Sequence, residues 1–273
     1  MRGMNLAPAK ARGQNFVRDA RLVRAAVEAA RLDAKTALVE VGPGTGSLTA
    51  ALAETHLPML CIELDRSLAA FLGTEYAREN LEIVCGDVLA RKRSFHPRLI
   101  EFMREQTQRG RKVVFVANLP YAILTPFFWN LLEVAPVWDR GVFLVQREFH
   151  QRLSSPPGRK TYGPLTAVAA LYWEISALRR VSPGTFWPAP GVESVLMSVD
   201  QIRPGEVPDR GFSEFLKILF AQRRKMLVGA LRRIAPDVEA GLLLEELGFD
   251  PRARAEEIGP ERLLELYRKF TAP

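Results

Sequence analysis

The chain has 273 residues, 48% of them apolar, which is enough for one large domain or for a medium domain with a small one. Its formal net charge of +7 favours a polyanionic partner, although a generally basic surface would give the same count. No segment approaches the roughly 18–20 uninterrupted apolar residues of a membrane span, and the basic N-terminus lacks the apolar core of a signal peptide. We therefore expect a globular, cytoplasmic protein that has no membrane partner.

The first half of the chain alternates short apolar runs with helix patterns. Strands are expected at 36–41, 59–62, 81–84, 113–117 and 141–145, with helices at 22–30, 47–56 and 66–78 and after residue 121. Such alternation implies βαβ units and a parallel sheet, so the predicted fold class is α/β. Residues 91–112 form a long basic piece, which could face RNA or be a solvated helix over one face of the sheet.

The second half changes character near residues 203–205, which we interpret as a linker. Before it, a loop at 154–163 and a helix at 165–172 precede two strands, at 174–181 and 192–199, expected as an antiparallel pair at the sheet edge. After it only helix patterns occur, at 212–220, 224–234, 238–247 and 261–270. We therefore predict one domain at 1–202 and a small helical domain at 203–273.

The cysteines and histidines show no metal-ligand spacing. Cys61 and Cys85 fall in apolar strand-like runs and are typical of reduced core residues in a cytosolic protein. His56, His96 and His150 stand far apart in the sequence. No metal is predicted.

Residues 39–49 are the stretch around which the chain is organised. An apolar run ends in Glu40, and Gly42, Gly44 and Gly46 then alternate before a helix pattern begins at Ser47. Glycines are needed where φ is positive or where a ligand approaches the backbone closely. The spacing differs from the G-x-G-x-x-G of dinucleotide sites, and an acidic residue beside the turn suits a ligand with a cationic end. The stretch therefore favours S-adenosylmethionine, which carries sulfonium and ammonium groups.

Two carboxylates follow later strands, Glu63 and Asp87. The carboxyl ends of parallel strands meet at one edge of the sheet, where ligands bind in open α/β folds. Glu63 could accept hydrogen bonds from a ribose diol, and Asp87 from an adenine amino group. Each could instead cap a helix or be a solvated carboxylate. Together with the glycine turn upstream, they favour a site for the adenosine half of the donor.

The segment Asn118-Leu119-Pro120-Tyr121 ends the fourth strand. An amine on a purine ring is a poor nucleophile because its lone pair is delocalised. The Asn118 side-chain oxygen and the Leu119 carbonyl could accept its hydrogens and localise that pair, while Pro120 fixes the turn. Tyr121 offers a stacking face for an extruded base. The alternative is a strand-ending turn with a packed tyrosine.

Two further features point toward a substrate. Phe186 is a candidate second stacking face, or else an aromatic residue that fills a domain junction. The basic run Arg223, Arg224 and Lys225 is expected to begin a helix that brings Arg224 or Lys225 near Arg232 two turns later. These side chains would contact phosphates, unless they form only a solvated helix face.

With these residues the chain resembles the small-subunit ribosomal RNA adenine dimethyltransferases. The resemblance covers nearly the whole chain, and its motifs occur in the family's order, although the glycine turn is shared by most methyltransferases of this fold. The matching segments are Gly-Gln-Asn-Phe at 13–16, Glu-Val-Gly-Pro-Gly-Thr-Gly at 40–46, Ile-Glu-Leu-Asp-Arg at 62–66, Gly-Asp at 86–87, Asn-Leu-Pro-Tyr at 118–121, Gln-Arg-Glu at 146–148, Tyr-Gly-Pro-Leu at 162–165, Phe-Trp-Pro-Ala-Pro at 186–190 and Phe-Ala-Gln-Arg-Arg-Lys at 220–225.

The resemblance implies a Rossmann-like class I methyltransferase domain and a helical C-terminal domain that binds rRNA. It implies transfer of methyl groups from S-adenosylmethionine to the exocyclic amines of two adjacent adenosines in the 3′-terminal hairpin loop of small-subunit rRNA, during ribosome biogenesis. The expected substrate is an immature 30S-type subunit, and the expected enzyme is a monomer. By the resemblance, the target adenine would be held by Asn118, Leu119 and Tyr121, with Phe186 opposite. The cofactor site would be lined by Asn15, Val17, Gly42, Glu63, Asp87 and Asn118.

Three alternatives remain open at this point. A related methyltransferase could act on large-subunit rRNA and confer macrolide resistance, but the complete basic segment at 220–225 and the sizeable helical domain favour the small subunit. Adenine DNA or glutamine methyltransferases use a similar turn, but they carry proline where this chain has Leu119. A non-catalytic assembly or transcription factor could lose Asn118 or Tyr121, and both are present. Three departures from the family leave the catalytic turn intact: Val17 for leucine, Gly-Val-Glu-Ser at 191–194 for Lys-Val-Asp-Ser, and a basic insert at 91–112 that is longer than usual.

Overall fold

The computed structural model describes residues 14–90, 94–234, 239–250 and 252–271. The chain divides into two compact units: the first runs to His150 and includes Glu174–Gly205, and the second comprises Gln151–Trp173 and the chain from Glu206 onward. The segment Gln151–Trp173 thus groups with the C-terminal helices, whereas the sequence-based division placed it in the first domain. No helix of the described residues is long and apolar enough to cross a membrane.

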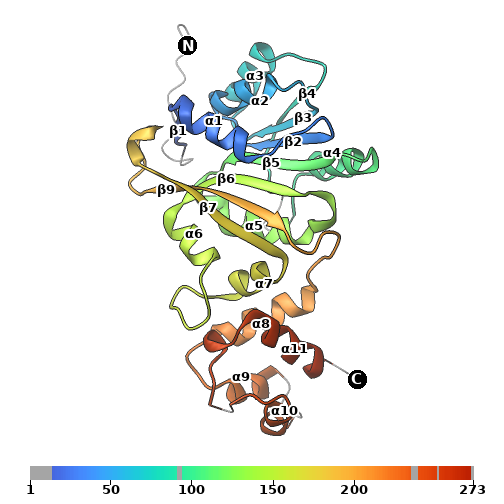
Figure 1. Ribbon diagram of the computed structural model, residues 1–273, viewed down its shortest axis with the longest axis vertical. Helices are drawn as coiled ribbons and strands as arrows, with labels where there is room; N and C mark the ends of the chain where they lie inside the picture. The colour runs from blue at the N-terminus through green and yellow to red at the C-terminus, as the bar shows by residue number, and fades with distance from the viewer. Residues whose placement is uncertain (1–13, 91–93, 235–238, 251, 272–273) are drawn as a thin grey trace. The chain divides into compact units, whose positions relative to one another are not determined.

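A seven-stranded sheet, in the order β4-β3-β2-β5-β6-β9-β7, organises the first unit (Figure 1). The strands from β4 to β6 are parallel and β9 runs antiparallel to β6, which confirms the α/β prediction. The order reverses between β2 and β5, so a crevice opens at their carboxyl ends. The strands are β2 (Thr36–Val41), β3 (Met59–Glu63), β4 (Leu81–Cys85), β5 (Lys112–Asn118), β6 (Arg140–Gln146), β7 (Trp173–Val181) and β9 (Ser194–Gln201).

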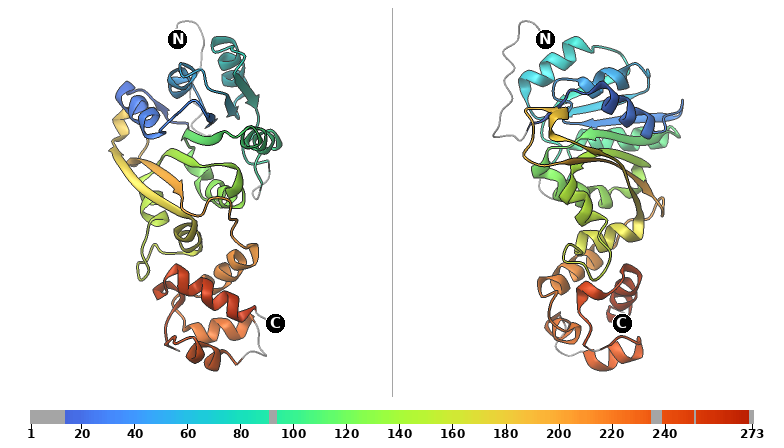
Figure 2. Two further views of the ribbon diagram at one scale, coloured as in Figure 1. Left: turned by 45° about the vertical axis from the view of Figure 1, so that its right-hand side comes forward. Right: turned by 60° about the vertical axis from the view of Figure 1, so that its left-hand side comes forward.

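Helices cover both faces of this sheet, and Figure 2 shows α1 in blue and α4 in green on opposite sides. Alternate strand residues point to opposite faces. Val116 therefore packs with Leu22 and Leu52 in one cluster, while Phe115 lies edge-on to Phe127 in an aromatic cluster on the other face. The helices of this unit are α1 (Ala20–Ala29), α2 (Ser47–Ala53), α3 (Arg66–Glu75), α4 (Pro97–Gln108) and α5 (Leu124–Glu133).

Helix α4 belongs to the basic stretch 91–112. Its apolar side is buried, while Arg98 donates to both carboxylate oxygens of Glu82, at 2.7 and 2.8 Å, and to Glu105 at 2.9 Å. Lys112 pairs with Asp33 at 3.1 Å. These contacts favour the solvated helix over the RNA-facing insertion. Residues 91–93 lie outside the described part of the chain.

A two-stranded ribbon joins distant parts of the first unit. β1 (Phe16–Val17) pairs antiparallel with β8 (Phe186–Trp187), and the Arg18 N–H continues the pairing to the Thr185 carbonyl at 3.0 Å. This ribbon was not predicted from the sequence. It ties the segment before α1 to the loop before β9.

The second unit is helical. The loop at 154–163 is held inside it, because the Tyr162 hydroxyl donates to the Ile258 carbonyl at 3.0 Å and its ring lies edge-on to Phe220. Gly158 N–H donates to the Glu256 carbonyl at 2.7 Å. The boundary between the units, after His150, falls within helix α6 (Arg147–Leu153). The helices that follow α6 are α7 (Pro164–Tyr172), α8 (Arg210–Ala221), α9 (Leu227–Ile234), α10 (Ala240–Glu246) and α11 (Pro260–Phe270).

Candidate functional site

A cavity of about 620 Å³ opens in the first unit where β2, β3, β4 and β5 end. It brings together most of the residues predicted to bind a donor and a target base. Its lining consists of Gln14, Asn15, Phe16, Val41, Gly42, Gly44, Ile62, Glu63, Leu64, Gly86, Asp87, Val88, Asn118, Leu119, Pro120, Tyr121, Ala122 and Ile123.

The glycine turn forms one wall of this cavity. Gly42, Gly44 and Gly46 have φ values of 66°, 59° and 80°, in the left-handed region that side chains rarely adopt. A Cβ at Gly44 would lie 2.6 Å from the Phe16 ring, and one at Gly46 would lie 2.8 Å from the Tyr76 ring. Gly42 and Gly44 line the cavity, whereas Gly46, which was also predicted at the cofactor site, does not line it and lies against Leu72 and Tyr76.

Two carboxylates hold different places around the cavity. Glu63 is 4% exposed, and its two oxygens accept from Gly44 N–H and Asp65 N–H, both at 2.9 Å. Burial raises the pKa of Glu63, although these hydrogen bonds oppose the shift. Each oxygen has a second lone pair, so a ribose diol can still bind. Asp87 is exposed, and its carboxylate accepts from Leu89 N–H at 2.9 Å.

Glu40 and Val17 were predicted at the cofactor site, but neither lines the cavity. Glu40 is 1% exposed and accepts from the Thr49 hydroxyl at 2.8 Å and from the Cys61 thiol at 3.6 Å. Burial raises its pKa to about 8. Val17 belongs to the apolar core. Along β2 the side chain of Glu40 points to the face opposite to those of Val39 and Val41. Its carboxyl group is bonded to Thr49 and Cys61 and does not line the cavity, so direct contact with a donor ammonium is not supported.

The Asn118 amide is oriented by the segment before β1. Its Nδ2 donates to the Asn15 carbonyl at 2.7 Å, which leaves Oδ1 as the acceptor. Leu119 is buried, and its N–H donates to the Leu144 carbonyl at 3.3 Å. The predicted catalytic residues Asn118, Leu119 and Tyr121 therefore share one wall of the cavity.

The Tyr121 hydroxyl lies 2.8 Å from the Ser194 hydroxyl at the start of β9. Burial raises the pKa of Tyr121, so the phenol is neutral at ordinary pH. Sequence reasoning missed Ser194, because nothing in the sequence pairs it with a residue 73 positions away. It also missed Phe16, although that residue stands inside a segment quoted for the resemblance.

Phe186 does not face the cavity in this structure. It is 3% exposed and packs in the core cluster with Val17, while its neighbour Trp187 is 45% exposed. The next residue on a strand points to the opposite face, which explains the contrast. The stacking of Phe186 on the target base stays a prediction, and the buried position of its ring does not support it.

The predicted phosphate contacts lie in the second unit, but not on a helix. Helix α9 begins only at Leu227, because Met226 forms a bridge with Arg254 and Leu227 N–H donates to the Ala253 carbonyl. The helical spacing expected between Arg224 and Arg232 is therefore wrong. Arg224 and Lys225 are exposed in the connection.

Arg223 differs from these two cations. Its guanidinium donates to the Lys160 carbonyl and lies 3.3 Å from the Glu256 carboxylate. It therefore stabilises the loop at 154–163 within the second unit. A role in phosphate binding would require it to leave these partners.

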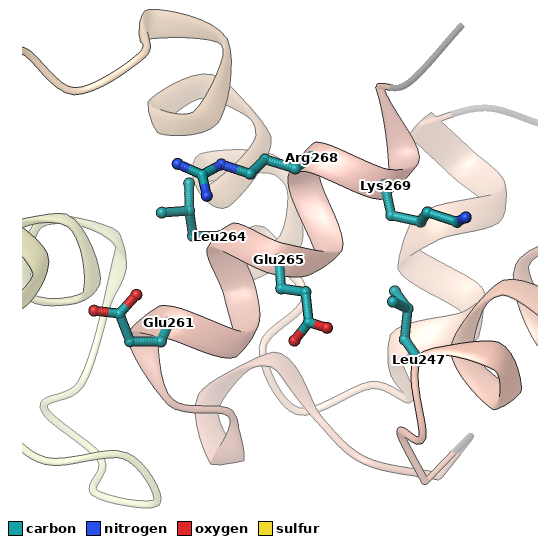
Figure 3. A pocket seen from close by; sticks show the side chains of 6 residues that line it. All are labelled: Leu247, Glu261, Leu264, Glu265, Arg268 and Lys269. Atoms are coloured by element: carbon teal, nitrogen blue, oxygen red, sulfur yellow. The ribbon is translucent and has the colours of Figure 1, made fainter.

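A second hollow, of about 550 Å³, lies on the second unit along α11. Its lining combines acidic, basic and apolar residues, namely Leu247, Glu261, Leu264, Glu265, Arg268 and Lys269. In Figure 3, Arg268 and Lys269 point to different sides of the helix, so their charges do not converge on one ligand position. None of the predicted site residues lines this hollow.

Comparison with known proteins identifies the family of the chain. Residues 8–272 match the family model described as ribosomal RNA adenine dimethylase. A Cutibacterium acnes protein named ribosomal RNA small subunit methyltransferase A is 38% identical over an alignment of 269 positions, which covers 93% of this chain and 86% of that protein. A dimethyladenosine transferase from Plasmodium falciparum shares the fold, with a TM-score of 0.74 and 21% identity over 92% of this chain and 95% of that one. So does the 23S rRNA methyltransferase ErmE, with a TM-score of 0.67 and 22% identity over 94% and 100%. The chain belongs to the ribosomal RNA adenine dimethylase family.

Proposed function

We propose that this chain transfers methyl groups from S-adenosylmethionine to the exocyclic amines of two adjacent adenosines in the 3′-terminal hairpin loop of small-subunit rRNA. The observation that carries the proposal is the position of Asn118, which lines the same cavity as the glycine turn and has its Nδ2 engaged by Asn15. An acceptor oxygen for a target amine therefore lies in the same cavity as a binding surface for the donor.

The cavity residues fit the donor. A Cβ at Gly42 would stand 3.7 Å from the Pro120 ring, so glycine keeps the space between the two turns open. Glu63 supplies acceptors for a ribose diol and Asp87 for an adenine amine, between the apolar side chains of Ile62, Leu64 and Val88. When bound there, S-adenosylmethionine supplies an electrophilic methyl group on a sulfonium.

The chain's own residues would prepare the target nitrogen. Asn118 Oδ1 and the Leu119 carbonyl would accept its two hydrogens, which localises the lone pair and aims it at the methyl group. Tyr121, fixed through Ser194, would hold the adenine ring by stacking. No strong general base is required, because the amine can lose its proton after the new bond has formed. Most of the rate would come from the positioning of the two reactants.

The name of the similar Cutibacterium acnes protein supports the small subunit as the substrate. The likeness to ErmE, at 22% identity, concerns the fold alone and does not favour the large-subunit alternative. A non-catalytic factor would have no need of the Asn118–Asn15 and Tyr121–Ser194 hydrogen bonds. We further propose that a monomer acts in the cytoplasm on immature 30S-type subunits.

Transfer of labelled methyl groups tests the proposal. The protein would be incubated with labelled S-adenosylmethionine and, separately, with unmodified small subunits, large subunits and DNA. Label is expected in the small-subunit rRNA, in adenosines of the 3′-terminal hairpin. Label only in DNA or in large subunits would reject the proposed substrate.

A further inference from the structure

An exposed tryptophan stands near the cavity without a role in the proposed reaction. Trp187 leaves 45% of its surface exposed, in contrast to Trp138 and Trp173 at 3%. Tryptophan is highly buried on average and combines a large apolar ring with a polar N–H, so an exposed indole next to a residue that lines the cavity is a candidate contact for a ligand.

The β1–β8 ribbon fixes where this indole lies. Trp187 stands opposite Phe16 in the strand register, and the two ring centroids are 6.4 Å apart with an interplanar angle of 31°. The backbone bond from Arg18 to Thr185 continues the ribbon beyond this pair. The position of the indole is therefore set by paired backbone on both strands.

Phe16 connects Trp187 to the reacting centre. Its ring lines the cavity and lies against Gly44, where no side chain larger than hydrogen would fit. The residue before it, Asn15, accepts the hydrogen bond from Asn118. Trp187 is thus separated from the cavity that holds the catalytic amide by a single aromatic ring. Arg18, on the same ribbon, is exposed and can meet a phosphate.

We propose that Trp187 stacks on an unpaired rRNA base that neighbours the adenosine held in the cavity. The inference rests on the proposed function and adds the contact that receives the adjacent nucleotide. A base is the occupant that fits, because unpaired RNA is recognised by stacking on aromatic faces beside cations that follow its backbone. Trp187 with Phe16 and Arg18 offers this combination beside the cavity, which Phe16 lines.

Steady-state methyl transfer to unmodified small subunits tests the role of the indole. Trp187→Ala is expected to raise the KM for the subunits by roughly 5- to 150-fold, the equivalent of one lost base–aromatic stack. The dissociation constant for S-adenosylmethionine should stay at the wild-type value, and Trp187→Phe should recover most of the loss. Leu178→Ala is the matched control, since Leu178 is 43% exposed on β7 and does not line the cavity.

A second measurement uses the wild-type protein and an RNA hairpin in which the base beside the target adenosine is removed. Removal of that base should weaken binding of the hairpin to the wild type but not to Trp187→Ala. In a fluorescence titration, RNA should quench a part of the tryptophan emission that is absent from Trp187→Phe. Equal KM values for wild type and Trp187→Ala, or equal binding of both hairpins by the wild type, would overturn the inference. Failure of the wild type to label rRNA would instead reject the proposed function. The quenching experiment measures RNA binding alone, so its result does not depend on methyl transfer.

Discussion

A segment 103 residues earlier in the chain orients the side-chain amide of Asn118. Because Nδ2 donates to the Asn15 carbonyl, the oxygen is the atom left for a target amine. Asn118→Ala removes that oxygen and should lower kcat by about 100-fold or more, as loss of a preorganised polar group in an active site does. Affinity for S-adenosylmethionine should change by no more than the ~1 kcal/mol of one hydrogen bond. Single-turnover methylation and calorimetric titration of the donor measure the two quantities.

Asn118→Asp separates the two functions of this amide. The aspartate keeps an acceptor oxygen but cannot donate to Asn15, and its charge would face a carbonyl. Turnover should therefore fall in this variant too, because the side chain at position 118 loses its orientation and not because the acceptor is lost. Turnover close to wild type in Asn118→Ala would refute the role assigned to the side chain.

The buried carboxyl group of Glu40 makes folding stability depend on pH. Burial raises its folded-state pKa from an ordinary 4.5 to about 8. Below pH 4.5 both the folded and the unfolded chain hold this proton. Between these values the unfolded chain releases it while the folded chain keeps it, so folding stability falls as pH rises, by up to ~1.4 kcal/mol per pH unit. Above about pH 8 the loss is complete and constant.

Glu40→Gln should remove this dependence while the amide oxygen still accepts from Thr49. We expect the free energy of unfolding to vary less between pH 5 and pH 8 in the variant than in the wild type, with the variant gaining relative stability toward pH 8. Denaturant unfolding at several pH values in that window measures the difference. Parallel stability curves for the two proteins would show that Glu40 titrates normally in the folded state.

At the scale of the element, the glycine turn depends on Phe16 as much as on its own backbone. An alanine at Gly44 would adopt a φ of 59° and place its Cβ 2.6 Å from the Phe16 ring. The left-handed conformation alone costs about 1–2 kcal/mol, and displacement of Phe16 would add to it and distort the cavity wall. Gly44→Ala should therefore lower both the free energy of unfolding and the affinity for S-adenosylmethionine.

Gly110→Ala is the matched control for this variant. Gly110 has a φ of 72°, in the same region, but a Cβ there meets nothing within 4 Å. This substitution should show the backbone cost alone, with unchanged donor affinity. If both variants lose stability equally and both bind the donor normally, the contact between Phe16 and Gly44 has no role in the site.

The strands of the sheet, and the strand ends at which the site lies, could be predicted because each sequence pattern lies within a short stretch of the chain. The apolar run that forms β2 is followed by its glycines, and the runs that form β3 and β5 end in the polar residues Glu63 and Asn118. Parallel pairing then brings those ends together at one edge. The cavity lining could therefore be anticipated at Gly42, Glu63, Asp87 and the segment 118–121, without knowledge of any tertiary contact.

The features that were missed depend on long-range contacts. Strands β1 and β8 have two residues each, which is too short for a periodic signal, and they pair across most of the chain. That pairing decides that Phe186 is buried and Trp187 exposed. Likewise, the bridge between Met226 and Arg254 delays the start of α9 and removes Arg224 from the expected helix. Periodicity describes one element at a time and contains no information on these partners.

At the scale of the whole molecule, the cations behind the net charge of +7 are not all equally available to a partner. Several arginines are committed to internal contacts: Arg98 with Glu82, Arg140 with Asp200 and Arg223 with Glu256. Arg224 and Lys225, in contrast, are exposed side by side. Arginine–carboxylate pairs add nothing to the net charge, which therefore does not say which cations are available to a polyanion. Arg224 and Lys225 are better candidates for phosphate contact than Arg223, which is paired with Glu256.

Reversal of both charges, in Arg224→Glu with Lys225→Glu, should weaken binding to small subunits and flatten its salt dependence. Each phosphate contact adds about one to the slope of log K against log salt, so the slope should fall by roughly two. Arg104→Glu with Arg109→Glu makes the same change in net charge at two exposed positions, on α4 and just after it, and should alter the slope much less. Equal effects of the two double variants would mean that rRNA senses only the total charge, and that Arg224 and Lys225 are a solvated face. Filter binding of labelled subunits over a range of salt concentrations distinguishes the two outcomes.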